Sequence, residues 1–181
     1  SLKDYAAVYA FGKHCDVITV EIEAVNTEAL QKLADEGKKV YPQPHLLALI
    51  QDKRTQKQFY REHDIPTANF ILTENKADVL ANAAFLPAVN KLGKEGYDGR
   101  GVQVLRTAAD LDLAFDAPGL LEKLIDFDKE IAVTVARNEQ GEVIAYPAVE
   151  CAFHPTANLV EFLFAPAAIS PEIEQKAQAI A

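Results

Sequence analysis

The sequence predicts an α+β fold that follows the last part of an α/β doubly wound domain. A buried strand at residues 15–22, an amphipathic helix at 27–36 and a short strand at 39–41 form one strand–helix–strand unit, with Gly37 ending the helix. From residue 119 onward, short strands are grouped around a turn at 138–141. Alternating helices and strands lie between these two parts, which predicts an antiparallel sheet with helices on one face.

The first unit is expected to be incomplete. Parallel sheets are covered on both faces and contain more than two strands, so further strands are expected before Ser1. The prolines Pro42 and Pro44 interrupt the pattern. We therefore predict a boundary that leaves residues 1–42 as the end of a truncated N-terminal domain and 43–181 as a second, C-terminally truncated domain. The absence of methionine agrees with a fragment of a longer polypeptide.

The second domain begins with two helices, at 45–50 and 52–63, and continues with alternating elements. Strands are expected at 69–72, 88–91 and 102–105, and a helix is expected at 76–83. Thr107 and Asp110 resemble a capping box at the start of another helix. Strands at 120–124, 130–137, 143–146 and 159–164 follow, and Ser170 with Pro171 begins a final helix.

Composition excludes several classes of partner. The 181 residues are 49% hydrophobic, enough for a sizeable core, and 18 basic against 27 acidic residues give a net charge of -9. Such a charge repels nucleic acid and anionic membranes, and no long apolar run predicts a membrane span, so a cytoplasmic protein is expected. Cys15 and Cys151 lack metal-site spacing and are expected to be buried thiols.

A glycine-rich segment between two predicted strands is the strongest chemical signal. Glycine allows positive φ and close backbone approach, so the loop could direct N–H groups at a polyphosphate while Lys91, at the end of the first strand, neutralises a phosphate oxygen. A plain hairpin turn is the alternative, because Asp-Gly is a common hairpin signal. Neither a Walker loop nor a dinucleotide fingerprint is present. The segment reads Gly96-Tyr97-Asp98-Gly99-Arg100-Gly101.

Over nearly its whole length the chain resembles the ATP-grasp superfamily. Within it the resemblance is to the N5-carboxyaminoimidazole ribonucleotide synthetase family, the ATPase subunit of phosphoribosylaminoimidazole carboxylase. Six segments occur in the order found in that family. They are DVITVEIE at 16–23, QDK at 51–53, IPTA at 65–68, PAVNK at 87–91, the glycine-rich segment, and YPAVE at 146–150.

The resemblance implies a nucleotide site. Lys91 and the glycine-rich segment would hold the triphosphate of ATP with Lys53, the backbone of 122–125 would read adenine, Glu130 would bind the ribose, and His154 would lie near the nucleotide. Without the resemblance, the lysine at 53 can equally be a solvated helical lysine, the two acids are interpreted as surface charges, and the histidine is interpreted as structural. Ligands for Mg²⁺ are expected beyond Ala181. The implied residues are Lys53, Lys91, Gly96, Tyr97, Asp98, Gly99, Arg100, Gly101, Val102, Glu122, Lys123, Leu124, Ile125, Glu130 and His154.

The resemblance also implies a reaction. An ATP-grasp ligase of this family carboxylates 5-aminoimidazole ribonucleotide with bicarbonate through carboxyphosphate, giving ADP and phosphate in purine biosynthesis. The parent enzyme is expected to be a homodimer, and the isolated fragment is expected to be inactive. Two alternatives remain. One is another ATP-grasp ligase, of the formate-dependent glycinamide ribonucleotide transformylase or biotin carboxylase type, and the other is a non-catalytic nucleotide-binding module.

Overall fold

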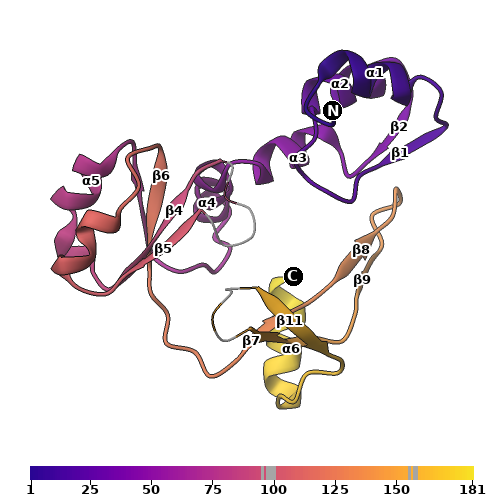
Figure 1. The fold of residues 1–181 in the computed structure, drawn as a ribbon. Helices are drawn as coiled ribbons and strands as arrows, with labels where there is room; N and C mark the ends of the chain where they lie inside the picture. Colours follow the sequence, from indigo (N-terminus) through magenta and orange to yellow (C-terminus); the bar gives the residue numbers. More distant parts are fainter. Residues whose placement is uncertain (95, 97–100, 155, 157–158) are drawn as a thin grey trace.

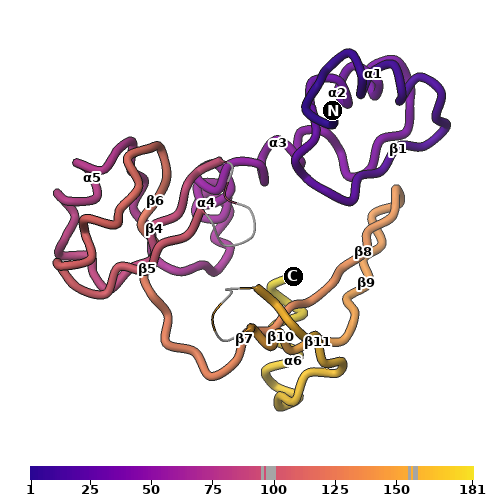
Figure 2. The backbone as a smooth tube through the Cα atoms, in the orientation of Figure 1, coloured from indigo at the N-terminus to yellow at the C-terminus, as the bar shows by residue number. Residues whose placement is uncertain are grey.

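The computed structural model describes residues 1–94, 96, 101–154, 156 and 159–181. Three groups of elements follow one another along the chain (Figure 1). The backbone trace leads from the first group into the central group, and from there through an extended segment into the C-terminal group (Figure 2). Within the described ranges, no helix has both the length and the apolar character needed to cross a membrane.

The first group is a strand–helix–strand unit with a helix on either side in sequence. Two parallel strands pair from Val17 opposite Lys39 to Thr19 opposite Tyr41. The side chain of Asn26 begins the second helix by accepting a hydrogen bond from the N–H of Ala29. The elements are α1 (Tyr5–Gly12), β1 (Val17–Thr19), α2 (Thr27–Asp35), β2 (Lys39–Tyr41) and α3 (Pro44–Ile50).

The predicted unit is confirmed, with three corrections. The first strand is shorter than the expected 15–22, and Val17 is 55% exposed. Cys15 is only half-buried. Helix α1 was not predicted, because its sequence YAAVYAFG is apolar all round and lacks a 3.6-residue period. The core of this group consists of Ile18, Val25, Leu30, Leu33, Val40 and Leu47.

The central group is built on a four-stranded antiparallel sheet of order β3-β6-β4-β5. The expected helix at 76–83 ends at Ala81 and continues as a 3₁₀ turn, and the capping box of Thr107 with Asp110 is confirmed at the start of a 3₁₀ helix. The elements are α4 (Lys53–Glu62), β3 (Phe70–Thr73), α5 (Lys76–Ala81), η1 (Ala83–Phe85), β4 (Ala88–Leu92), β5 (Val102–Leu105), η2 (Ala108–Leu113) and β6 (Gly119–Lys123).

Helices cover both faces of this sheet, not one face as the sequence predicted. Leu121 is fully buried against Val79 of α5. Its neighbour Glu122 points to the opposite face, since successive strand residues alternate, and there it meets Lys57 of α4. Figure 1 shows α4 and α5 on either side of the strands. The α5 face therefore carries the apolar core, and the α4 face carries charged groups.

Gly119 allows β4 and β6 to approach closely. A Cβ atom at this position would lie 2.2 Å from the carbonyl oxygen of Lys91. The strands are in register with Leu92 opposite Gly119 and Val89 opposite Glu122. Because a backbone oxygen cannot move aside as a flexible side chain can, only glycine fits here, and the register places Glu122 beside Lys91 on one face.

The C-terminal group contains a three-stranded sheet of order β11-β10-β7 and a separate hairpin. The predicted strand at 130–137 is two strands that belong to different sheets. Strand β10 was not predicted, because Pro147 and Glu150 weaken the local strand pattern. Ser170 caps the final helix as expected. The elements are β7 (Glu130–Ala132), β8 (Val135–Arg137), β9 (Val143–Ala145), β10 (Val149–Phe153), β11 (Val160–Phe164) and α6 (Pro171–Ile180).

The hairpin of β8 and β9 extends toward the first group (Figure 1). Gly141 in its turn has φ 86°, a conformation that favours glycine. Glu139 at the tip accepts a hydrogen bond from the hydroxyl of Tyr41 and lies 3.6 Å from Lys39 Nζ. The tip therefore contacts β2, although 98 residues separate Tyr41 from Glu139.

Candidate functional site

Glu122 lies between two lysines on the α4 face of the central sheet. Lys91 Nζ donates to one carboxylate oxygen at 2.6 Å, and Lys57 Nζ donates to the other at 2.6 Å. The side chains of Glu122 and Lys57 are 12% and 11% exposed, whereas that of Lys91 is 29% exposed. Glu122 is therefore not the solvated surface acid that its sequence context alone allowed.

The two lysines keep Glu122 ionised. Burial would raise the pKa of this carboxyl, but the hydrogen bonds and charges of Lys57 and Lys91 outweigh burial and hold the pKa below its ordinary value of 4.5. The cluster is therefore one carboxylate with two ammonium groups, and it carries a net positive charge. Of these groups, Lys91 is the most accessible to a ligand.

The ends of the glycine-rich segment meet beside a third lysine. A Cβ atom on Gly96 would lie 3.0 Å from the Cα of Gly101 and 3.4 Å from Lys53 Nζ. A Cβ atom on Gly101 would lie 2.3 Å from the Cα of Gly96. The N–H of Leu92 donates to the carbonyl of Gly101 at 2.9 Å. Gly96 and Gly101 therefore lie against each other at the base of the loop, and Gly96 lies beside the ammonium group of Lys53.

A buried carboxylate connects α4 to the same loop. Asp52, 4% exposed, accepts from the N–H of Arg54 and caps α4, and the guanidinium of Arg54 donates to both its carboxylate oxygens. The N–H of Lys53 donates to the carbonyl of Gly93 at 2.8 Å. A Cβ atom on Gly93 would lie 2.9 Å from Asp52 Oδ1. The start of α4 is thus attached to the strand end that precedes the glycine-rich segment.

The segment expected to read adenine follows Glu122. The N–H of Lys123 already donates to Asn69 at 2.8 Å, and that of Leu124 donates to Pro87 at 3.2 Å. The ammonium of Lys123 binds the carbonyls of Phe85 and Leu86, so this side chain supports η1. A purine that accepts a backbone hydrogen bond here can accept it from the N–H of Ile125, a residue that is 52% exposed. The N–H of Leu124 could serve instead only if it released the carbonyl of Pro87.

Of the other predicted site residues, Val102 adjoins the cluster, Glu130 and His154 belong to the C-terminal group, and four lie outside the described ranges. Val102 begins β5 opposite Lys91. Glu130 is exposed in β7, opposite Cys151. The pKa of the Cys151 thiol is raised, first by burial of the thiol and second by the negative charge of Glu130. The N–H of His154 donates to Leu159 after β10. Tyr97, Asp98, Gly99 and Arg100 lie outside the residues that the structure describes.

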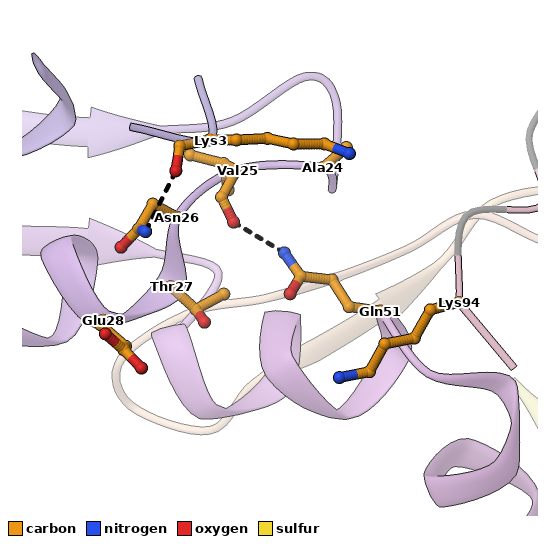
Figure 3. A pocket seen from close by; sticks show the side chains of 8 residues that line it. All are labelled: Lys3, Ala24, Val25, Asn26, Thr27, Glu28, Gln51 and Lys94. Carbon is orange, nitrogen blue, oxygen red and sulfur yellow. Dashed lines mark hydrogen bonds between the residues drawn. The ribbon is translucent and has the colours of Figure 1, made fainter. Parts of the chain in front are cut away.

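A second feature is a cavity of about 300 Å³, which lies between residues of the first group and Lys94. Figure 3 shows Gln51 donating to the carbonyl of Val25 and Asn26 donating to that of Lys3, while Lys94 approaches from the opposite side. Two lysines and Glu28 give the cavity a polar lining. Its lining residues are Lys3, Ala24, Val25, Asn26, Thr27, Glu28, Gln51 and Lys94.

Neither Lys57 nor this cavity was predicted from the sequence. Lys57 is four residues after Lys53 on α4, a spacing that places both on one helix face and could have been recognised. The cavity has no such signal, since residues far apart in sequence form it. Among the described residues, no group of three or more histidine, cysteine or acidic side chains could hold a metal ion. No residue within the described ranges is therefore assigned to magnesium.

The fold and the lysine-rich site define a class of protein: the chain belongs to the ATP-grasp family. The model of the ATP-grasp domain matches residues 58–181, and that of the ribonucleotide synthetase preATP-grasp domain matches 1–51. The α+β fold with a preceding α/β segment is thus confirmed. The boundary after residue 42 stays a prediction.

Within this family, the chain is homologous to N5-carboxyaminoimidazole ribonucleotide synthases. It is 36% identical to the enzyme of Synechococcus elongatus over all of this chain and 47% of the relative. A carboxyaminoimidazole ribonucleotide synthase structure from Aspergillus clavatus complexed with ATP matches with a TM-score of 0.89 and 33% identity, covering 99% of this chain and 48% of that one. The chain thus spans about half the length of these relatives.

A second structure from Aspergillus clavatus contains two ligands. This N5-carboxyaminoimidazole synthase is in complex with ADP and 5-aminoimidazole ribonucleotide. It matches with a TM-score of 0.85 and 32% identity, covering 99% of this chain and 48% of that one. The likeness therefore extends to an enzyme of known ligands over nearly the whole chain.

Proposed function

We propose that the chain forms the ATP-binding part of an N5-carboxyaminoimidazole ribonucleotide synthase. In this proposal, ATP phosphorylates bicarbonate and the product carboxylates 5-aminoimidazole ribonucleotide in purine biosynthesis. The observation that carries the proposal is that Lys91 and Lys53 lie beside the two ends of the glycine-rich segment. The homology to synthases that bind ATP and this ribonucleotide supports it. The parent enzyme is proposed to be a cytoplasmic homodimer.

The phosphate end of the site is proposed to consist of two ammonium groups and the loop. Lys91 is the accessible member of the charged cluster and ends the strand that leads to the loop, and Lys53 Nζ lies beside Gly96. Ammonium groups are compact cations that suit phosphate oxygens. Because Gly96 and Gly101 bring the loop ends together, the backbone between them can fold over a polyphosphate. Residues 122–125 and Glu130 are proposed to hold the adenosine.

The proposed chemistry has two steps. Bicarbonate oxygen attacks the γ-phosphorus of ATP, which gives carboxyphosphate and ADP. The exocyclic amine of the ribonucleotide then attacks the carboxyl carbon, the bond from that carbon to the phosphate oxygen breaks, and the amine nitrogen loses a proton. Lys91 and Lys53 would offset the negative charge that builds up on the transferred phosphoryl group. A closed loop would protect carboxyphosphate from water.

The cavity beside Lys94 is proposed to receive the ribonucleotide. Its two lysines suit the phosphate of the ribonucleotide, and Glu28 can accept hydrogen bonds from the ribose hydroxyls.

Replacing Lys94 by methionine in the complete gene product is expected to raise the KM for the ribonucleotide roughly threefold to tenfold. The KM for ATP should stay unchanged. Lys32→Met, which removes an exposed lysine of α2, is the control. An equal rise in both KM values would contradict the assignment of the cavity.

The test of the function is ribonucleotide-dependent release of ADP. The complete gene product containing this chain is assayed with Mg-ATP and bicarbonate, with and without 5-aminoimidazole ribonucleotide. Replacing Lys91 by methionine is expected to lower this release at least about a hundredfold, because a charge that stabilises the transition state is lost. Lys32→Met should retain full activity.

Two other results would redirect the proposal. If release of ADP depended on formate and glycinamide ribonucleotide, or on biotin, the protein would be another ATP-grasp ligase. Binding of ADP without turnover with any of these substrates would favour a nucleotide-binding module. If Lys91→Met released ADP as fast as the unchanged protein, the phosphate site would have to lie elsewhere.

A further inference from the structure

Lys57 is the most enclosed cation of the charged cluster, and neither the sequence motifs nor the proposed chemistry uses it. Its ammonium donates to Glu122 and to the hydroxyl of Thr67, and it lies 5.9 Å from the centre of the Phe70 ring. Its side chain is 11% exposed. Three contacts and this burial keep Lys57 in place, so it is poorly suited to reach a ligand itself.

Lys91 is held less firmly than Lys57. Within the described part of the chain, its ammonium donates only to Glu122, and its side chain is 29% exposed. Each lysine uses a different carboxylate oxygen. Lys91 can therefore leave the carboxylate without disturbing the bond between Lys57 and Glu122.

We infer that Lys57 is a positioning residue: it neutralises Glu122, so that Lys91 can exchange this carboxylate for the phosphates of a nucleotide. This inference rests on the proposed nucleotide site. If Lys57 were absent, moving Lys91 to the phosphates would leave Glu122 without a cation. An enclosed carboxylate without a partner is costly, and here it would also repel the incoming phosphates. Lys91 would consequently stay bound to Glu122.

The inference predicts weaker nucleotide binding when Lys57 loses its charge. In calorimetric titrations of the complete gene product with ADP, Lys57→Met is expected to raise the Kd about tenfold or more. Lys57→Arg should recover most of the affinity, because a guanidinium keeps the charge. Arg61→Met is the matched control, since Arg61 lies on the same helix, 5.3 Å from the same Phe70 ring, and makes no contact with Glu122.

A second comparison separates positioning from a structural role. In the Glu122→Gln background no carboxylate needs a cation, so adding Lys57→Met should change the Kd by less than about twofold. A structural role would weaken binding equally in both backgrounds, and this result would overturn the inference. So would equal affinities of Lys57→Met and the unchanged protein. If the unchanged protein failed to bind ADP, the proposed nucleotide site itself would be wrong.

Discussion

Replacing Glu122 by leucine is expected to destabilise the chain by about 3 kcal/mol, because the enclosed ammonium of Lys57 and the partly exposed ammonium of Lys91 lose their shared carboxylate. Lys57 and Lys91 both donate to this side chain at 2.6 Å, and no other acidic partner of either is found in the described ranges. The loss should appear as a lower midpoint in urea unfolding followed by circular dichroism. The slope of the transition should stay unchanged.

Removing all three charges tests this explanation. A variant that combines Lys57→Met, Lys91→Met and Glu122→Leu has no unpaired charge, so it should recover most of the lost stability. The sign of the pH dependence gives a further check. Because the folded protein lowers the pKa of Glu122, its contribution is present at neutral pH and is lost as the pH falls below 4.5 toward the folded pKa. A Glu122→Leu variant as stable as the unchanged chain at neutral pH would contradict the role of this cluster.

Replacing Gly101 by alanine is expected to weaken ADP binding by at least about tenfold, because the added methyl group separates the loop ends. Its Cβ would lie 2.3 Å from the Cα of Gly96, which is a backbone atom and cannot rotate away as the end of a side chain can. Titration with ADP measures the effect. Circular dichroism should show that the sheet remains folded, since the glycine lies outside β5.

Gly37→Ala is the matched control for this variant. Gly37 has φ 88° after α2, and a Cβ atom there would contact nothing within 4 Å. The substitution should cost about 1 kcal/mol of stability through backbone strain, and it should leave the affinity for ADP unchanged. If Gly101→Ala bound ADP as tightly as Gly37→Ala, close contact between the loop ends would not be needed for binding.

Local signals predicted most of the fold. The strand–helix–strand unit, the cap at Ser170 and the capping box of Thr107 with Asp110 depend on neighbouring residues, and all were confirmed. The failures came from tertiary context. Helix α1 has no polar face, and strand β10 is stabilised by β7 and β11 on either side, which its own sequence does not reveal.

The positions of the residues proposed to bind phosphate were predictable where they belong to a motif. Lys91 and the glycines at 96 and 101 stand out in the sequence, and they lie at the strand end and loop base as expected. The environment of Glu122 was not predictable, since Lys57 is 65 residues away in sequence and comes from another element. A pattern can identify an acid, but burial and partners from distant segments determine whether it is a surface charge or part of a site.

The register of β6 makes its length critical. Leu121 contacts the apolar core and Glu122 contacts the lysines, so inserting one residue between Gly119 and Leu121 would exchange the two faces. Leucine would then face the ammonium groups, and a carboxylate would enter the core. The tip of the β8–β9 hairpin is exposed and can accommodate an extra residue far more easily. Insertions should therefore be tolerated at 138–141 and excluded from 119–122.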